Sequence, residues 1–86
     1  MTSAMQTVLE VAEWCDRRGH PLPVRVLAGI LNAAGHRTSY GTPYRGRRGT
    51  YRLVKATYRR LMQAGRSAEA AMVARTFTRP NGAYAY

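Results

Sequence analysis

The chain has 86 residues, 45% of them hydrophobic, which is enough for one compact domain and too few for a catalytic domain joined to a recognition domain. Fourteen Lys and Arg against four Asp and Glu give a net charge of +10, and so basic a chain favours a polyanionic partner such as nucleic acid. One cysteine and two histidines exclude an internal disulfide and a zinc set. With no signal-peptide pattern and no long apolar run, we expect a cytoplasmic protein without a membrane role.

The charges are unevenly distributed along the chain. Glu10, Glu13 and Asp16 all precede residue 17, and residues 17–86 then carry every base against Glu69 alone. Thirteen of the bases are arginine, whose planar fork binds phosphate or guanine through two hydrogen bonds. A GC-rich genome explains the same bias equally well, and a solvated basic face without a partner is the alternative to nucleic-acid binding.

The first predicted helix runs from Ser3 or Ala4 to Arg18 and stops at Gly19. An apolar stripe recurs along it at helical spacing and is expected to face the core. Trp14 falls on the opposite side, where we expect it to pack against another element such as the C-terminal hairpin, with a partner interface as the alternative. The stripe consists of Met5, Val8, Leu9, Ala12 and Cys15.

A stiff segment, His20–Pro23, leads into a second helix that begins near Val24 and stops at Gly35. Residues 35–49 contain four glycines and four arginines, a composition that predicts a loop. We expect the loop arginines to contact nucleic-acid backbone or the minor groove, and a purely solvated loop is the alternative. The candidate residues in this stretch are Arg37, Arg45, Arg47 and Arg48.

Thr50 is the expected N-cap of a third helix that is closed by Gly65. Arg52, Lys55 and Arg59 share one side of this helix, opposite the apolar arc. A row of cations beside a cap hydroxyl is typical of a recognition helix in the major groove, so these three residues and Thr50 are candidate DNA contacts. The apolar arc consists of Tyr51, Val54, Tyr58, Leu61 and Met62.

Ser67 is the expected cap of a short fourth helix. The pattern then becomes strand-like on both sides of residues 79–82, where the Asn-Gly pair tolerates the positive φ of a tight turn. We predict a β-hairpin over residues 73–86 with Arg79 near its tip as a further DNA contact. The elements together predict one domain, residues 1–86, that is mainly α with a C-terminal β-hairpin, a winged helix-turn-helix.

A motif follows the start of the second helix, composed of Val26-Leu27, Leu31-Asn32, Gly35, Thr38 and Gly41. With the helix from Thr50, it resembles the helix-turn-helix DNA-binding segment that follows the catalytic domain in serine recombinases and resolvases. The resemblance covers about residues 24–61 and implies DNA binding by a free-standing module, as in a regulator of a phage or mobile element. The longer, more basic stretch 42–49 and the lack of a preceding catalytic domain depart from that family, so recombinase activity is not implied.

Catalysis is not expected from this composition. His20 and His36 lie sixteen residues apart, and the scarce acids offer no carboxylate pair for acid–base or metal chemistry. The sequence therefore favours a non-enzymatic, sequence-specific DNA-binding protein without cofactor or metal, either a monomer or a homodimer.

Two other functions remain open from the sequence. One is a small basic inhibitor or accessory protein that docks on a host protein or nucleoprotein complex, which an exposed patch of Trp14, Tyr84 and Tyr86 would favour. The other is RNA binding, for which only Phe77 and those two tyrosines of the expected hairpin offer an aromatic platform.

Overall fold

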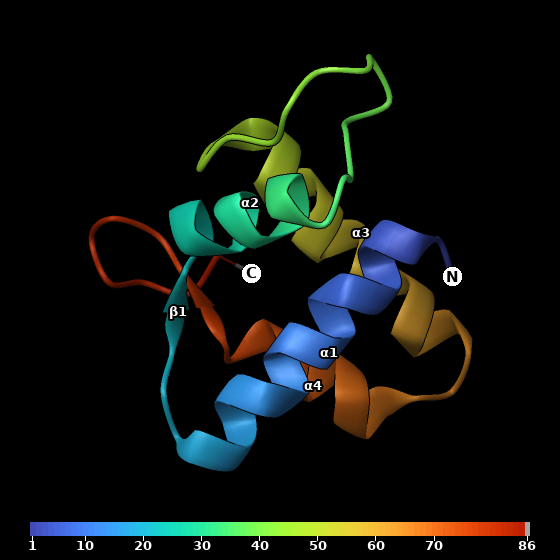
Figure 1. Ribbon diagram of the computed structural model, residues 1–86. Helices are drawn as coiled ribbons and strands as arrows, with labels where there is room; N and C mark the ends of the chain where they lie inside the picture. Colours follow the sequence, from blue (N-terminus) through green and yellow to red (C-terminus); the bar gives the residue numbers. More distant parts are fainter. Residues whose placement is uncertain (86) are drawn as a thin grey trace.

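Four helices enclose one apolar core in the computed structural model, which describes residues 1–85 (Figure 1). The mainly helical class predicted from the sequence is confirmed. None of the helices in this range is long and apolar enough to cross a membrane. In chain order the elements are α1 (Ser3–Arg18), β1 (Leu22–Pro23), α2 (Val24–Ala33), α3 (Arg48–Gln63), α4 (Ser67–Ala74) and β2 (Phe77–Thr78).

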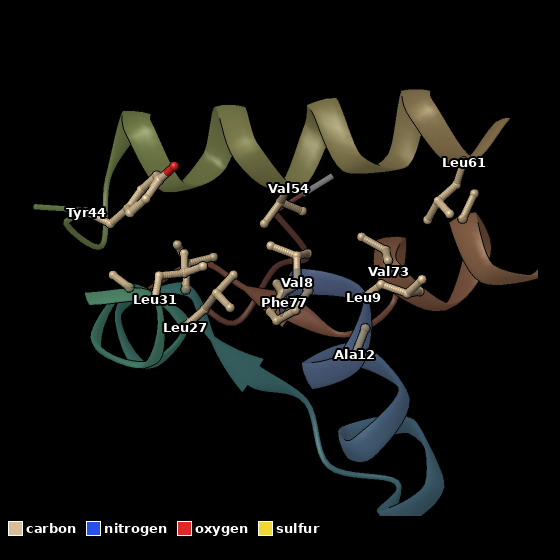
Figure 2. Packing of buried hydrophobic residues seen from close by; sticks show 13 residues of the cluster. Val8, Leu9, Ala12, Leu27, Leu31, Tyr44, Val54, Leu61, Val73 and Phe77 are labelled. Atoms are coloured by element: carbon tan, nitrogen blue, oxygen red, sulfur yellow. The ribbon is translucent and has the colours of Figure 1, made fainter. Parts of the chain in front are cut away.

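The core lies between α3 on one side and α1 with α2 on the other (Figure 2). Leu9, Leu27 and Leu61 come from these three helices, and each is at most 1% exposed. Phe77 of β2 is equally buried and closes the core below α3. Burial of these apolar side chains is the main favourable term in the folding of so small a domain.

The bounds of α1 follow from its end residues. The Thr2 hydroxyl accepts a hydrogen bond from the Met5 amide (3.2 Å), and Gly19 ends the helix at a φ of +65°. Trp14 was expected to pack against another element; it lines a hollow with Leu22 of β1 and Ile30 of α2, and 53% of its surface stays exposed. The guanidinium of Arg18, one turn later on the same helix, lies 3.8 Å from the centroid of the Trp14 ring.

Helix α3 begins at Arg48 after the N-cap residue Arg47, three residues earlier than predicted. Thr50 is therefore not the N-cap but a fully buried residue whose hydroxyl donates to the carbonyl of Arg45. Met62 was also expected in the core and is 47% exposed. Thr57 takes its place on the buried arc. The Thr57 hydroxyl donates a hydrogen bond to the Leu53 carbonyl (2.7 Å), so its burial costs little free energy.

The predicted hairpin over residues 73–86 is wrong in its pairing. The first part of that range still belongs to α4, and β2 pairs in parallel with β1, in the register Leu22 to Phe77 and Pro23 to Thr78. After β2 the chain does reverse, but Thr78 and Tyr84 form only an isolated antiparallel bridge. The sequence pattern indicated the turn. The strand partner of β2 could not be seen from the pattern, because β1 lies more than fifty residues earlier in the chain. Tyr86 lies outside the described residues.

Candidate nucleic-acid interface

The segment between α2 and α3, green in Figure 1, arches away from the helices but is fixed at its middle. The side-chain amide of Asn32 donates to the Tyr44 carbonyl (2.8 Å), and its oxygen accepts from the Tyr44 amide (2.7 Å). The Tyr44 side chain is buried in the core, and this burial raises the pKa of its phenol. A purely solvated loop is therefore ruled out for this part of the segment.

A second set of contacts shapes the first half of the segment. The Thr38 amide donates to the Thr42 carbonyl (2.9 Å), the two hydroxyls lie 2.7 Å apart, and Gly41 adopts a φ of +77° between them. This closed turn presents Tyr40 to solvent, with 85% of its surface exposed. Gly46 then packs on α2 so closely that an added Cβ would lie 2.7 Å from the Cβ of Arg25.

A groove of about 750 Å³ separates this segment from α3. Arg45, Arg47, Arg48 and Arg52 line it, together with the exposed Tyr40. No acidic residue is among its lining residues. Four arginines around one open groove create a positive potential that suits an anionic ligand.

The positive surface continues along α3 in two smaller hollows. One, of about 440 Å³, includes Arg52, Lys55, Arg59 and Arg60. The other, of about 420 Å³, includes Arg52, Lys55 and Arg79. Arg52 lines the groove and both hollows, so it stands at their junction. We call the combined surface the basic face; its cations are Arg45, Arg47, Arg48, Arg52, Lys55, Arg59, Arg60 and Arg79.

The structure brings together seven of the nine site residues predicted from the sequence and separates two. Thr50 is buried in the first turn of α3 and cannot contact a ligand. Arg37 does not line the groove; its guanidinium donates to the carbonyls of Asn32 (3.3 Å) and His36 (2.7 Å) at the end of α2. Arg79 does reach the basic face, but it lies over the Tyr51 ring, 4.8 Å from the centroid, rather than at the tip of a wing.

Three features of this site were missed by reasoning from the sequence. Arg60 was not among the predicted site residues, although it shares a hollow with Lys55 and Arg59. Tyr40 was treated as a loop residue. The Asn32–Tyr44 contact leaves no local signal, because the two residues are distant in sequence and meet only after α2 and α3 pack.

The acids lie elsewhere, and two of the four form ion pairs. Asp16 pairs with Arg75 (3.0 Å) and Glu69 with Arg66 (2.7 Å), the two ion pairs formed among residues 1–85. The hydrogen bond from Arg66 lowers the pKa of Glu69. No cation of the basic face takes part in an ion pair within that range. The basic face therefore keeps its full charge.

No group of three His, Cys, Asp or Glu side chains comes together in residues 1–85. Phe77 is 1% exposed, so it does not form the aromatic platform considered for RNA.

No family model, curated protein or solved structure matches the chain.

Proposed function

We propose that this protein binds duplex DNA through the basic face and has no catalytic activity. The observation that carries the proposal is the segregation of charge: the two ion pairs lie outside the basic face, while its eight cations have no acidic partner within residues 1–85. Each cation that meets a phosphate releases condensed counterions, so an unpaired row of this kind favours a polyanion.

The shape of the basic face suits two kinds of contact with a duplex, one to base edges and one to backbone phosphates. Helix α3 has 16 residues, about 24 Å at 1.5 Å per residue, and its exposed side is narrow enough to enter a major groove. Arg52 lies in the first half of α3, where recognition helices approach base edges. The groove arginines Arg45, Arg47 and Arg48 flank that end and are suited to backbone phosphates.

The resemblance to the recombinase DNA-binding segment is consistent with this proposal. Its motif residues have identifiable tasks here: Asn32 fixes Tyr44, Thr38 closes the turn with Thr42, and Gly35 adopts a φ of +86° after α2. We therefore propose a sequence-specific DNA-binding regulator of a phage or mobile element, with α2 and α3 as its DNA-binding helices.

The proposal is tested with two variants that lose the same charge from different places. Arg45→Ala/Arg47→Ala/Arg48→Ala removes three cations from the basic face, and Arg17→Ala/Arg66→Ala/Arg75→Ala removes three exposed cations from elsewhere. Fluorescence anisotropy with a labelled random-sequence duplex should show a loss of affinity of roughly tenfold or more for the first, and less than about threefold for the second.

Salt titration of the same complexes gives a second readout. The logarithm of the binding constant should fall with the logarithm of salt concentration with a slope on the order of −5 for the natural chain. In the Arg45→Ala/Arg47→Ala/Arg48→Ala variant the slope should be less steep by about 2 to 3, because each phosphate contact contributes about 0.9 to the slope. Absence of binding at low salt, or equal effects of the two triple variants, would contradict the proposal.

A further inference from the structure

A second exposed surface lies on the other side of the core. Trp14 is 53% exposed on α1, and Val26 and Ile30, one turn apart on α2, are 39% and 37% exposed. A hollow of about 330 Å³ opens beside Trp14 and is lined otherwise by Glu10, Val11, Cys15, Leu22 and Ile30. Large apolar side chains gathered around a hollow are typical of contact surfaces, and tryptophan is the side chain most enriched at their centres.

The charges around this surface restrict the partners that it can accept. A second copy of so basic a chain is repelled almost everywhere by the first. Helix α1 is the exception, because it holds three of the four acids. Glu10 lies four residues before Trp14 and Arg18 four residues after it, on the same outward side of the helix as Trp14. The helix is therefore self-complementary about Trp14 when two copies run antiparallel.

We propose that this surface joins two copies of the chain in a symmetric dimer. The two α1 helices cross antiparallel near Trp14, and each Glu10 pairs with Arg18 of the second copy. Each Trp14 side chain enters the hollow beside Val11 and Ile30 of the other copy, and Val26 extends the apolar contact along α2. Such a contact is isologous and closes at two copies.

The surface is separate from the one proposed to bind DNA. The core side chains lie between α3 and the α1–α2 pair (Figure 2), and the hollow beside Trp14 shares no lining residue with the groove or hollows of the basic face. A dimer formed in this way leaves both basic faces free. The dimer proposal stands or falls independently of DNA binding, because it is tested on the protein alone.

The test is sedimentation equilibrium of the full chain at concentrations from about 1 to about 300 µM, a range that covers micromolar association. We expect a monomer–dimer equilibrium for the natural chain. Trp14→Glu should be monomeric throughout. Met62→Glu is the matched control, since it places the same charge at a side chain of similar exposure on α3 and should leave the dimer intact.

Charge exchange tests the predicted pairing. Glu10→Arg and Arg18→Glu should each weaken the dimer tenfold or more, and the double variant should recover to within about threefold of the natural chain. Arg18→Glu is the more decisive variant of the two. It lowers the net positive charge and so reduces the general repulsion between copies, which means that a weaker dimer can only come from the loss of the specific pair. Arg60→Glu makes the same charge change on α3 and should not weaken the dimer.

Circular dichroism must show unchanged helix content for each variant before its mass is interpreted. Any of three results would overturn the proposal: a natural chain that stays monomeric over the whole range, a dimer that survives Trp14→Glu, or a double charge exchange that fails to recover.

Discussion

At the residue scale, Arg52 is distinguished from the other cations by its position. It is the one described residue that lines the groove and both hollows of α3. A side chain at such a junction lies near the middle of any ligand that covers the basic face, whereas Arg59 borders only one hollow. The two arginines should therefore affect affinity and specificity differently.

We predict that Arg52→Ala weakens binding to a preferred duplex by roughly 1–3 kcal/mol and binding to scrambled DNA much less. Arg59→Ala should weaken both alike, as expected for a phosphate contact. The preferred sequence is first selected from a random duplex pool, and both variants are then measured on matched and scrambled duplexes. An unchanged ratio in Arg52→Ala would show that α3 does not read bases.

Asn32 illustrates how one amide can position a whole segment. If the Asn32 side chain is removed, the backbone amide and carbonyl of Tyr44 both lose their hydrogen-bond partner. We predict that Asn32→Ala lowers the free energy of unfolding by about 2–3 kcal/mol, a fall in Tm on the order of 10 °C for a domain of this size. Gln6→Ala, which removes one long contact (3.4 Å) on the surface, is the control and should change Tm little. Equal melting of the two variants would refute the role given to Asn32.

At the scale of elements, the segment between α2 and α3 behaves as part of the domain. The Asn32–Tyr44 contact, the closed turn at Thr38 and the bond from the Thr50 hydroxyl tie it to both helices. Its arginines are consequently presented on a fixed backbone, and fewer conformations have to be lost on binding than with a free loop. Changes in its backbone packing should affect binding without removing any charge.

We predict that Gly46→Ala reduces both stability and DNA affinity. The new Cβ would meet the Cβ and Cα of Arg25 at 2.7 and 2.8 Å, so the segment must move away from α2 at a cost of about 1–3 kcal/mol. Gly29→Ala is the matched control, because nothing lies within 4 Å of its added Cβ, and alanine should stabilise α2 by up to about 1 kcal/mol. Thermal melting and anisotropy test both; a Gly46→Ala variant as stable as the natural chain would contradict the close approach.

At the scale of the whole molecule, eight of the fourteen bases gather on the basic face, and all four acids lie outside it. The acids of α1 and α4 neutralise Arg66 and Arg75, and the basic face is left without compensation. Such a surface repels itself in the folded state more than in the expanded chain, so it lowers stability unless ions or a polyanion screen it.

We therefore predict that Tm rises as NaCl increases from about 20 to about 300 mM, because the Debye length shortens across this range. Duplex DNA at low salt should raise Tm further, by an amount that corresponds to about 2.7 kcal/mol at a hundredfold excess over Kd. Differential scanning fluorimetry measures both effects. A Tm that falls with salt would mean that favourable ion pairs outweigh repulsion, contrary to the charge distribution described above.

Local sequence patterns determined much of this protein. The apolar stripe of α1, the cation row of α3 and the glycine-rich break before it depend on neighbours within one or two turns, and all three occur in the structure. The side chains on α3 that carry the proposed site were predictable for this reason: once Val54 and Leu61 face the core, helical geometry turns Arg52 and Arg59 outward.

Tertiary contacts decided the rest. Thr50 is buried, Trp14 is exposed and β2 pairs with β1. Each of these outcomes depends on residues that are distant in the chain. The same holds for the groove, which exists because Asn32 holds Tyr44 and so sets the loop arginines beside α3. The sequence by itself determined which side chains are charged and which helix faces are apolar, since these are local properties. Only the packed structure decided which charges lie together and which remain unpaired, because those depend on long-range contacts that no local pattern records.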